Sequence, residues 1–185
     1  MRKIILTVLT ATTLLLPITT VFAGPLTISF GIPQDHTFSE NIENDESNGY
    51  FLGIKFPVGF GLGIDNYKTK FKGDTSKIVT IMYNIFYHFP IPVINIKIGL
   101  GSGKTKLDCS TCAEDYIDPE SGKKIGYKAG EASQWYTSLG IQLTQFIDIH
   151  MSYRSVTSKK IEQVYNGAKV NYSGKVKGLG LSFNF

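Results

Sequence analysis

The sequence predicts an all-β fold, a single antiparallel up-and-down transmembrane barrel of about eight strands. Three observations predict it: apolar and polar residues alternate along most of the chain, short turns alternate with long polar connections, and the polar face of the strands carries few charges. Glycine and aromatic residues are also frequent, with 19 Gly, 12 Phe and 10 Tyr in 185 residues. Both suit closely packed strands that are bordered by aromatic rings.

The first 23 residues have the features of a secretory signal peptide. Residues 1–3 are a short basic start, and a mainly apolar run interrupted by Pro17 follows them. Val21 and Ala23 precede the expected cleavage site, so the mature chain is predicted to begin at Gly24. The alternative, an uncleaved anchor helix, is disfavoured because the run is marginal for a hydrocarbon core of about 30 Å. Residues 24–185 then form one domain, the barrel.

Seven segments show the two-residue period of strands with one apolar face, and an eighth segment is also expected to be a strand. In the first of them, Leu26 and Ile28 alternate with Thr27 and Ser29. Residues 78–89 are apolar on both faces, so the pattern leaves their inside and outside open. The expected strands cover residues 26–32, 50–56, 60–65, 78–89, 94–101, 134–143, 147–154 and 178–185.

The connections between these segments alternate in length. Three are tight and rich in turn formers, at residues 57–59, 90–92 and 145–146. Short turns on one side and long loops on the other, with an even number of strands, are typical of a transmembrane barrel whose turns and termini are periplasmic. The long polar connections cover approximately residues 33–48, 66–77, 102–131 and 156–173.

The polar face of the strands distinguishes a membrane barrel from a soluble one. A soluble barrel exposes charged residues outside, whereas this face consists mainly of Gly, Ser, Thr, Asn and Gln. We therefore expect it to line a narrow interior, with His88 opposite Asn95 and Gln142 opposite His150. Basic side chains there should pair with the two aspartates, because an unpaired buried charge is costly. The expected interior polar network is Lys55, Asp65, His88, Asn95, Lys97, Asp148, His150 and Arg154.

Aromatic residues gather near the expected strand ends, as two interfacial girdles of a membrane barrel require. The set, more than any single ring, indicates two interfaces. Phe56, Phe60, Phe89, Phe146 and Phe185 lie beside the short turns, and Tyr50, Tyr67 and Trp135 lie toward the long loops.

The chain ends on Phe185, with Phe183 and Leu181 at alternate positions and Gly180 before them. Gly180, Phe183 and Phe185 resemble the terminal signal that outer-membrane barrels present to their assembly machinery. Together with the leader, the length and the alternating loops, this ending makes the mature chain similar to the small OmpA/OmpX-like or OmpW-like barrels. The resemblance implies a location in the cell outer membrane and carries no catalytic residue with it.

Cys109 and Cys112 are the two cysteines of the chain, and they lie in the longest expected loop. In an oxidising compartment, a local disulfide that stiffens the loop is the preferred interpretation. A thioredoxin-like role is disfavoured because Asp108, Glu114 and Asp115 would raise the pKa of a thiol. A zinc site would need two further ligands, so no metal or other cofactor is expected.

One weak catalytic pattern is present. His150-Met151-Ser152 resembles the His-x-Ser of the lipid A deacylases related to PagL, in which the histidine activates the serine, and Glu162 could orient the histidine. However, Tyr153 stands where that family has asparagine, and His150 is assigned to the interior, away from lipid. An interior hydrogen-bonding histidine is therefore preferred, and the chain is not expected to be an enzyme.

The expected loops carry most of the charge, and solvated loops are preferred over a cation site or a contact with lipopolysaccharide. The balance of 19 Lys+Arg against 15 Asp+Glu gives no indication of a nucleic-acid partner. The expected function is a structural or surface-interaction role of a monomer, through its external loops and with an external ligand or surface. Other expected partners are outer-membrane lipid, lipopolysaccharide and the assembly machinery. The alternative is a narrow OmpW-like channel for small or apolar solutes, followed by a lipid A hydrolase.

Overall fold

The computed structural model describes residues 26–40, 42–89, 91, 94–162, 164 and 169–185. The expected signal peptide and its cleavage site lie outside the described residues. No helix within the described ranges is long and apolar enough to cross a bilayer.

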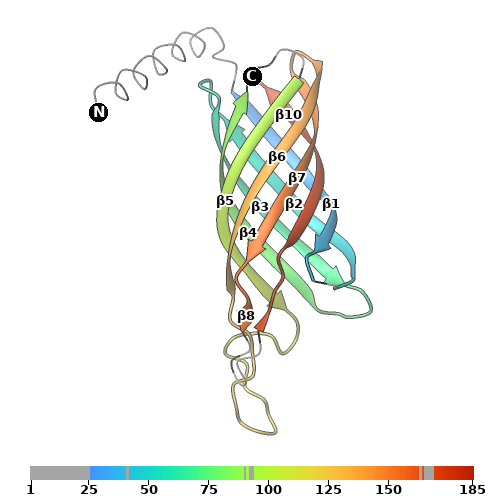
Figure 1. Cartoon of the computed structure of the whole chain (residues 1–185), viewed down its shortest axis with the longest axis vertical. Helices are drawn as coiled ribbons and strands as arrows, with labels where there is room; N and C mark the ends of the chain where they lie inside the picture. Colours follow the sequence, from blue (N-terminus) through green and yellow to red (C-terminus); the bar gives the residue numbers. More distant parts are fainter. Residues whose placement is uncertain (1–25, 41, 90, 92–93, 163, 165–168) are drawn as a thin grey trace, which may run out of the picture.

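Eight long strands close into one antiparallel barrel, as the sequence predicts (Figure 1). Each strand pairs with its neighbours in the chain, and the first strand closes the ring with the last, β10. The two short strands β8 and β9 form a separate hairpin between β7 and β10. The strands are β1 (Thr27–Phe38), β2 (Asn44–Lys55), β3 (Phe60–Phe71), β4 (Lys77–Phe89), β5 (Ile94–Asp108), β6 (Gly130–Thr144), β7 (Ile147–Ser158), β8 (Ile161–Glu162), β9 (Lys169–Val170) and β10 (Gly174–Asn184).

The strands are staggered around the barrel. A path through directly paired residues that starts at Phe183 returns to the same strand at Lys175, eight residues away. Such a stagger tilts the strands and leaves a narrow interior that side chains can fill. The path passes through Ile28, Ile54, Leu62, Ile85, Leu100, Trp135 and Ser155.

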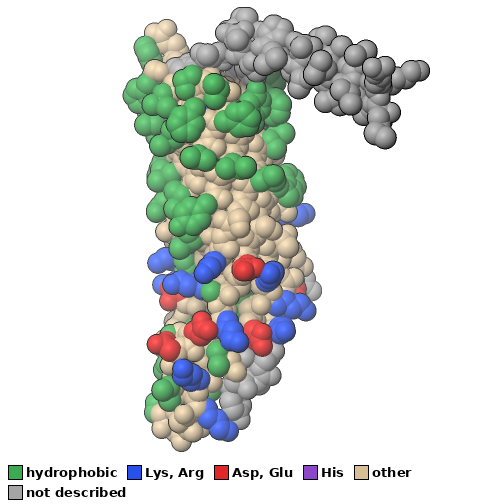
Figure 2. Space-filling view, turned by 90° about the vertical axis from the view of Figure 1, so that its left-hand side faces the viewer, with side chains coloured by type: hydrophobic (Ala, Val, Ile, Leu, Met, Phe, Trp, Pro, Cys, Tyr) green, Lys and Arg blue, Asp and Glu red, His purple; other side chains and the backbone are tan. Residues whose placement is uncertain are grey.

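An apolar belt surrounds the outside of the barrel at the end where β1 begins and β10 ends, which we call the terminal end. Its members are large side chains such as Leu62, which is 56% exposed, and Met151, which is 65% exposed. In the face shown by Figure 2, hydrophobic side chains gather on the upper part of the molecule and charged ones gather below them. Exposure of so large an apolar surface to water is unfavourable, so this belt is the part of the barrel that lies in lipid.

The strands extend beyond the belt, and there the two faces exchange character. Side chains continue to alternate in direction, but apolar residues now point inward and lysines point outward. On β10, the outward residue changes from Leu179 in the belt to Lys175 beyond it, while Val176 is fully buried inside. On β3, Leu62 faces lipid, whereas Tyr67 is only 1% exposed. The outer part of the barrel is thus built like a soluble barrel, with an apolar core.

This exchange explains why several expected loops were too long. Residues 33–38 and 44–48 belong to strands, as do residues 66–71, and the connections shrink to residues 39–43 and 72–76. The expectation that Tyr67 belongs to an aromatic girdle is likewise wrong, because its ring lies inside. Trp135 and Tyr83 are the exposed rings near that interface.

The structure also corrects two cross-strand pairs and settles one open assignment. Across the β4–β5 hairpin, His88 lies opposite Lys97 instead of Asn95. Across the β6–β7 hairpin, an irregularity before Thr144 shifts the register, so that His150 lies opposite Gly140. In β4, Met82 is fully buried inside and Tyr83 is exposed, which fixes the parity of this strand.

Candidate functional site

A buried ion pair spans the middle of the barrel. Nε of Arg154 on β7 donates to Oδ2 of Asp65 on β3 at 3.0 Å, and both side chains are nearly inaccessible to solvent. Gln134 Nε2 donates to the same carboxylate oxygen at 2.6 Å and to Oδ1 of Asn84, also at 2.6 Å. Four strands are therefore tied together across the interior by one polar layer.

Aromatic rings enclose the arginine of this layer. The guanidinium carbon of Arg154 lies 3.5 Å from the centroid of the Phe51 ring and 4.9 Å from that of Tyr136. Both rings are buried, and their negative faces stabilise the cation where water is excluded. The free space that remains beside these side chains is about 30 Å³. One or two water molecules fit there, and a solute does not.

Toward the termini, the interior is lined by a second group of polar residues. Lys97 Nζ donates to the hydroxyls of Ser29 at 2.7 Å and Ser182 at 3.1 Å, and the Ser182 hydroxyl is 3.2 Å from His150 Nδ1. Asn184 Nδ2 donates to Asp148 Oδ2 at 3.1 Å.

The remaining three residues of the expected network also face inward. His88 Nε2 lies 3.0 Å from Asn95 Oδ1, although the two residues are not directly opposite each other. Lys55 is 5% exposed. The expected network left out the serines, Asn84 and Gln134, although their place on the inward face was a usable signal. It also left out the rings of Phe51 and Tyr136, although both lie on the inward face of the expected strands 50–56 and 134–143.

Beyond the ion pair, the interior is apolar and closely packed. Phe51, Tyr67, Met82, Ala132, Val156 and Val176 form one buried cluster that fills this part of the barrel. One buried polar atom at this level, His36 Nε2, has no hydrogen-bond partner within the described residues.

At the end far from the termini, the connections form an ordered cap on the barrel. A second apolar cluster of Phe38, Ile78, Ile161 and Tyr172 closes the mouth, and Tyr127 packs against it from the long loop. Backbone hydrogen bonds join loops that are distant in sequence. Lys128 N donates to Glu162 O at 2.9 Å, and Val164 N donates to Gly126 O at 2.8 Å. We call residues 109–129 together with residues 159–162, 164 and 169–173 the cap.

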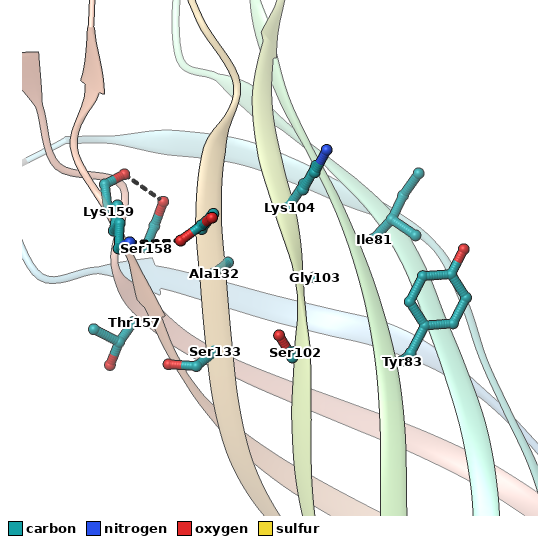
Figure 3. A pocket seen from close by; sticks show the side chains of 11 residues that line it. Ile81, Tyr83, Ser102, Gly103, Lys104, Ala132, Ser133, Thr157, Ser158 and Lys159 are labelled. Atoms are coloured by element: carbon teal, nitrogen blue, oxygen red, sulfur yellow. Dashed lines mark hydrogen bonds and ion pairs between the residues drawn. The ribbon is translucent and has the colours of Figure 1, made fainter.

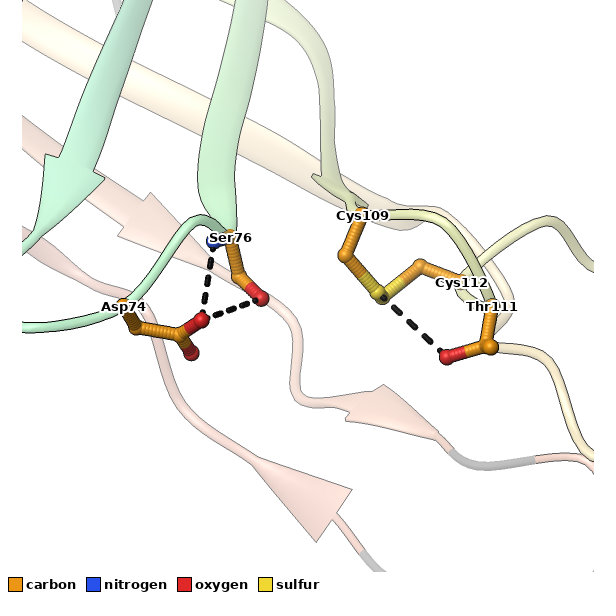
Figure 4. Close-up of a disulfide and its surroundings, with 5 residues drawn as sticks. All are labelled: Asp74, Ser76, Cys109, Thr111 and Cys112. Carbon is orange, nitrogen blue, oxygen red and sulfur yellow. Dashed lines mark hydrogen bonds between the residues drawn. A yellow bond between two sulfur atoms is a disulfide. The ribbon is translucent and has the colours of Figure 1, made fainter.

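A disulfide joins Cys109 to Cys112 at the base of the cap (Figure 4). Their Cα atoms are 5.1 Å apart, and Cys112 is only 3% exposed. Tyr127 N donates to the carbonyl of Cys112 at 3.2 Å, and this hydrogen bond joins the first and last parts of the long loop beside the disulfide. In the neighbouring connection, the backbone N–H and the hydroxyl of Ser76 donate to Asp74, which lowers the pKa of that carboxyl.

The tip of the cap presents mixed side chains to solvent. Ile117 is 55% exposed, and its strand-like pairing with Lys124 closes the tip. The hydroxyl and backbone N–H of Ser121 donate to Asp118 and lower its pKa. The tip is therefore an ordered hairpin with an apolar residue surrounded by charges.

The residues of the weak catalytic pattern are engaged elsewhere. Ser152 accepts a hydrogen bond from Arg154, while His150 contacts the hydroxyl of Ser182. Glu162 lies in β8 of the cap, where it forms an ion pair with Lys169 at 3.8 Å. A nucleophilic serine needs its base within hydrogen-bond reach, and these three side chains form no such array. Nor do the described residues include a cluster of three metal-binding side chains.

Solved structures share this architecture. Neisserial surface protein A is 12% identical, with a TM-score of 0.60 over 88% of this chain and 97% of that one. The N-terminal barrel domain of Pseudomonas aeruginosa OprF is 13% identical, with a TM-score of 0.54 over 88% and 98%. Ail, the attachment invasion locus protein of Yersinia pestis, is 14% identical, with a TM-score of 0.52 over 88% and 99%. No family model and no curated protein matches the sequence.

Proposed function

We propose that this small bacterial outer-membrane β-barrel protein binds a ligand or surface outside the cell through its cap. The protein lies in the outer membrane, and the contrast between short turns at one end and the cap at the other supports an orientation with the turns toward the periplasm and the cap toward the exterior. The observation that carries the proposal is the order of the cap. A disulfide, a hairpin, a cross-loop hydrogen-bond network and an apolar base hold it in one shape.

An ordered cap supports binding better than a set of solvated loops would. Loops that only keep the surface hydrated need no internal structure, whereas a preorganised surface loses less conformational entropy when it binds a partner. The exposed Ile117 at the tip, among charged residues, is a suitable anchor for such a contact. The partner expected here is therefore a macromolecular surface and not a small solute.

A second candidate function is passage of small apolar solutes. The observation that favours it is the apolar inner surface around Tyr67 and Met82 beyond the polar layer. Against it, the same side chains fill the barrel, and the ion pair of Arg154 with Asp65 closes the polar layer below them. Passage would need both layers to open. Planar-bilayer recordings of the purified barrel separate the two functions, because a closed barrel gives no conductance steps.

The test of the binding proposal exchanges the tip alone. Residues 113–126 are replaced by a short Gly-Ser linker, which keeps the disulfide and Tyr127. As a matched control, residues 72–76 of the neighbouring short connection are replaced in the same way. Cells that display each variant are applied to immobilised matrix proteins and glycosaminoglycans. We expect wild-type and control cells to adhere to at least one of them and the tip variant to lose adhesion. Equal adhesion of all three would refute the proposal.

The C-terminal segment is proposed to direct assembly. Phe183 and Phe185 face lipid, with 39% and 71% of their surface exposed, and Gly180 lies in the same strand. β10 pairs with β1 and so closes the barrel. If β10 is the strand that engages the assembly machinery, its pairing with β1 would be the last step of barrel closure. Deleting Phe185 should then slow membrane insertion in cells without changing refolding of the purified chain in detergent.

A further inference from the structure

The outward-facing charges beyond the apolar belt are distributed unevenly around the barrel. On or directly beside the outer ends of β3 to β7 there are seven lysines and two acidic residues. The rest of the barrel, formed by β10, β1 and β2, carries two lysines and four acidic residues on or directly beside its outer ends. The first wall is therefore strongly basic. Its charged residues are Lys68, Lys70, Lys72, Lys77, Lys104, Lys106, Lys159, Asp108 and Glu131.

A hollow of about 1040 Å³ lies on the outside of this basic wall. Three small hydroxyl residues form its floor, because Ser102, Ser133 and Thr157 are directly paired on β5, β6 and β7. Figure 3 shows these side chains on three neighbouring strands, with Lys104 and Lys159 above them in the view. Larger side chains surround these three residues, and the hollow is open to the outside of the barrel.

Ser102, Ser133 and Thr157 form a hydroxyl row across the three strands. The neighbouring row on one side of it is apolar, and the neighbouring row on the other side is charged. The row nearer the periplasm is apolar, with Leu100 beside Trp135, and both side chains are exposed. The row farther out is charged: Lys104 lies opposite Glu131, and Glu131 accepts a hydrogen bond from Lys159 at 2.5 Å. Two lysines thus share one carboxylate, and the row keeps a positive charge.

We propose that this hollow binds lipopolysaccharide through the phosphorylated sugar of its lipid A part. From the membrane outward, such a molecule presents acyl chains, sugar hydroxyls and phosphate. The wall presents an apolar row, a hydroxyl row and a basic row in the same order and at the outer-leaflet interface. Lys104 and Lys159 would contact the phosphate, Ser102, Ser133 and Thr157 the sugar, and Trp135 an acyl chain. This site is separate from the cap, and it does not depend on the proposed function.

The experiment titrates purified bis-phosphorylated lipid A into the folded barrel in detergent. Trp135 is the single tryptophan of the chain, so its fluorescence reports from the edge of the hollow. Native mass spectrometry counts retained lipid molecules independently. The test variant is K104Q/K159Q, and the matched control is K175Q/K177Q on β10, which removes the same charge from two residues that do not line the hollow.

We expect saturable binding to wild type and control, and an affinity that is at least about tenfold lower for K104Q/K159Q, because this variant loses two positive charges at the lipid surface. Lipid A without phosphates should bind wild type as weakly as the intact lipid binds the test variant. Ser133→Leu, which fills the hollow and leaves the charges, should also weaken binding.

Three results would overturn the proposal. Absence of saturable binding to wild type is the first. Equal loss of affinity in K175Q/K177Q would show general attraction to positive charge, and equal binding of phosphatidylglycerol would show a site for any anionic lipid. A heat-dependent shift on SDS gels, measured for every variant, establishes that each barrel is closed, so that misfolding is not mistaken for lost binding.

Discussion

The guanidinium of Arg154 lies against the ring of Phe51, with 3.5 Å between its central carbon and the ring centroid, while its nitrogens bind Asp65. Phe51 comes from β2, Asp65 from β3 and Arg154 from β7. The contact joins strands from opposite sides of the barrel at the level where polar interior changes to apolar interior. It ties these strands together across the interior of the barrel.

Breaking this ion pair should destabilise the barrel strongly. Arg154→Met leaves the Asp65 carboxylate buried without its cation, which we expect to lower the free energy of unfolding by about 3–5 kcal/mol. The double variant D65N/R154M removes both charges and should recover a large part of that loss. Urea unfolding in lipid vesicles, followed by the gel shift of the folded barrel, measures both. Equal stability of the two variants would contradict this account of the pair.

Gly99 should not tolerate a side chain. A Cβ at this position would collide with the ring of Tyr136, which lies directly over the glycine from β6. We expect Gly99→Ala to lower the free energy of unfolding by about 1–3 kcal/mol through overpacking. Adding Tyr136→Leu should restore part of the loss, because the smaller side chain leaves room. The same unfolding assay tests both variants, and an unchanged midpoint for Gly99→Ala would show that the ring moves freely.

The base of the cap should depend on Ile161. This side chain is 1% exposed within the apolar cluster that closes the mouth, so Ile161→Ala should cost about 2–4 kcal/mol of local stability. Faster hydrogen exchange of the backbone amides in β8 and β9 would report the loss, while amides in the membrane part stay protected. Ile117→Ala is the control, because Ile117 is 55% exposed at the tip. Its exchange pattern should match wild type.

Reduction of the disulfide should loosen the cap and leave the barrel closed. The bond closes a very short loop, so the expected loss is about 2 kcal/mol and is confined to residues 109–129. Trypsin should then cleave after Lys123 or Lys124 faster in reducing buffer than in oxidising buffer. The serine double variant C109S/C112S should behave like the reduced protein in both buffers. Cleavage that does not respond to reduction would mean that the apolar base alone orders the cap.

The sequence by itself determined the barrel, the number of strands and the membrane belt. These follow from local patterns: a two-residue period fixes which residues share a face, and connection lengths fix the topology. The inward direction of His150 and Lys97 follows from the same parity. Contact with lipid is enough to explain why outward residues of the belt, such as Leu62, are apolar, whatever residues lie next to them.

Only the tertiary structure decided what happens beyond the membrane. Beyond the membrane, the barrel is surrounded by water instead of lipid, so the apolar residues face inward and the charged residues face outward. A single strand of this part, such as residues 66–71, therefore has the composition of a polar loop. The partners of Arg154 and the row formed by Ser102, Ser133 and Thr157 depend on register and stagger between strands. These relationships join residues far apart in the chain, and no local pattern encodes them.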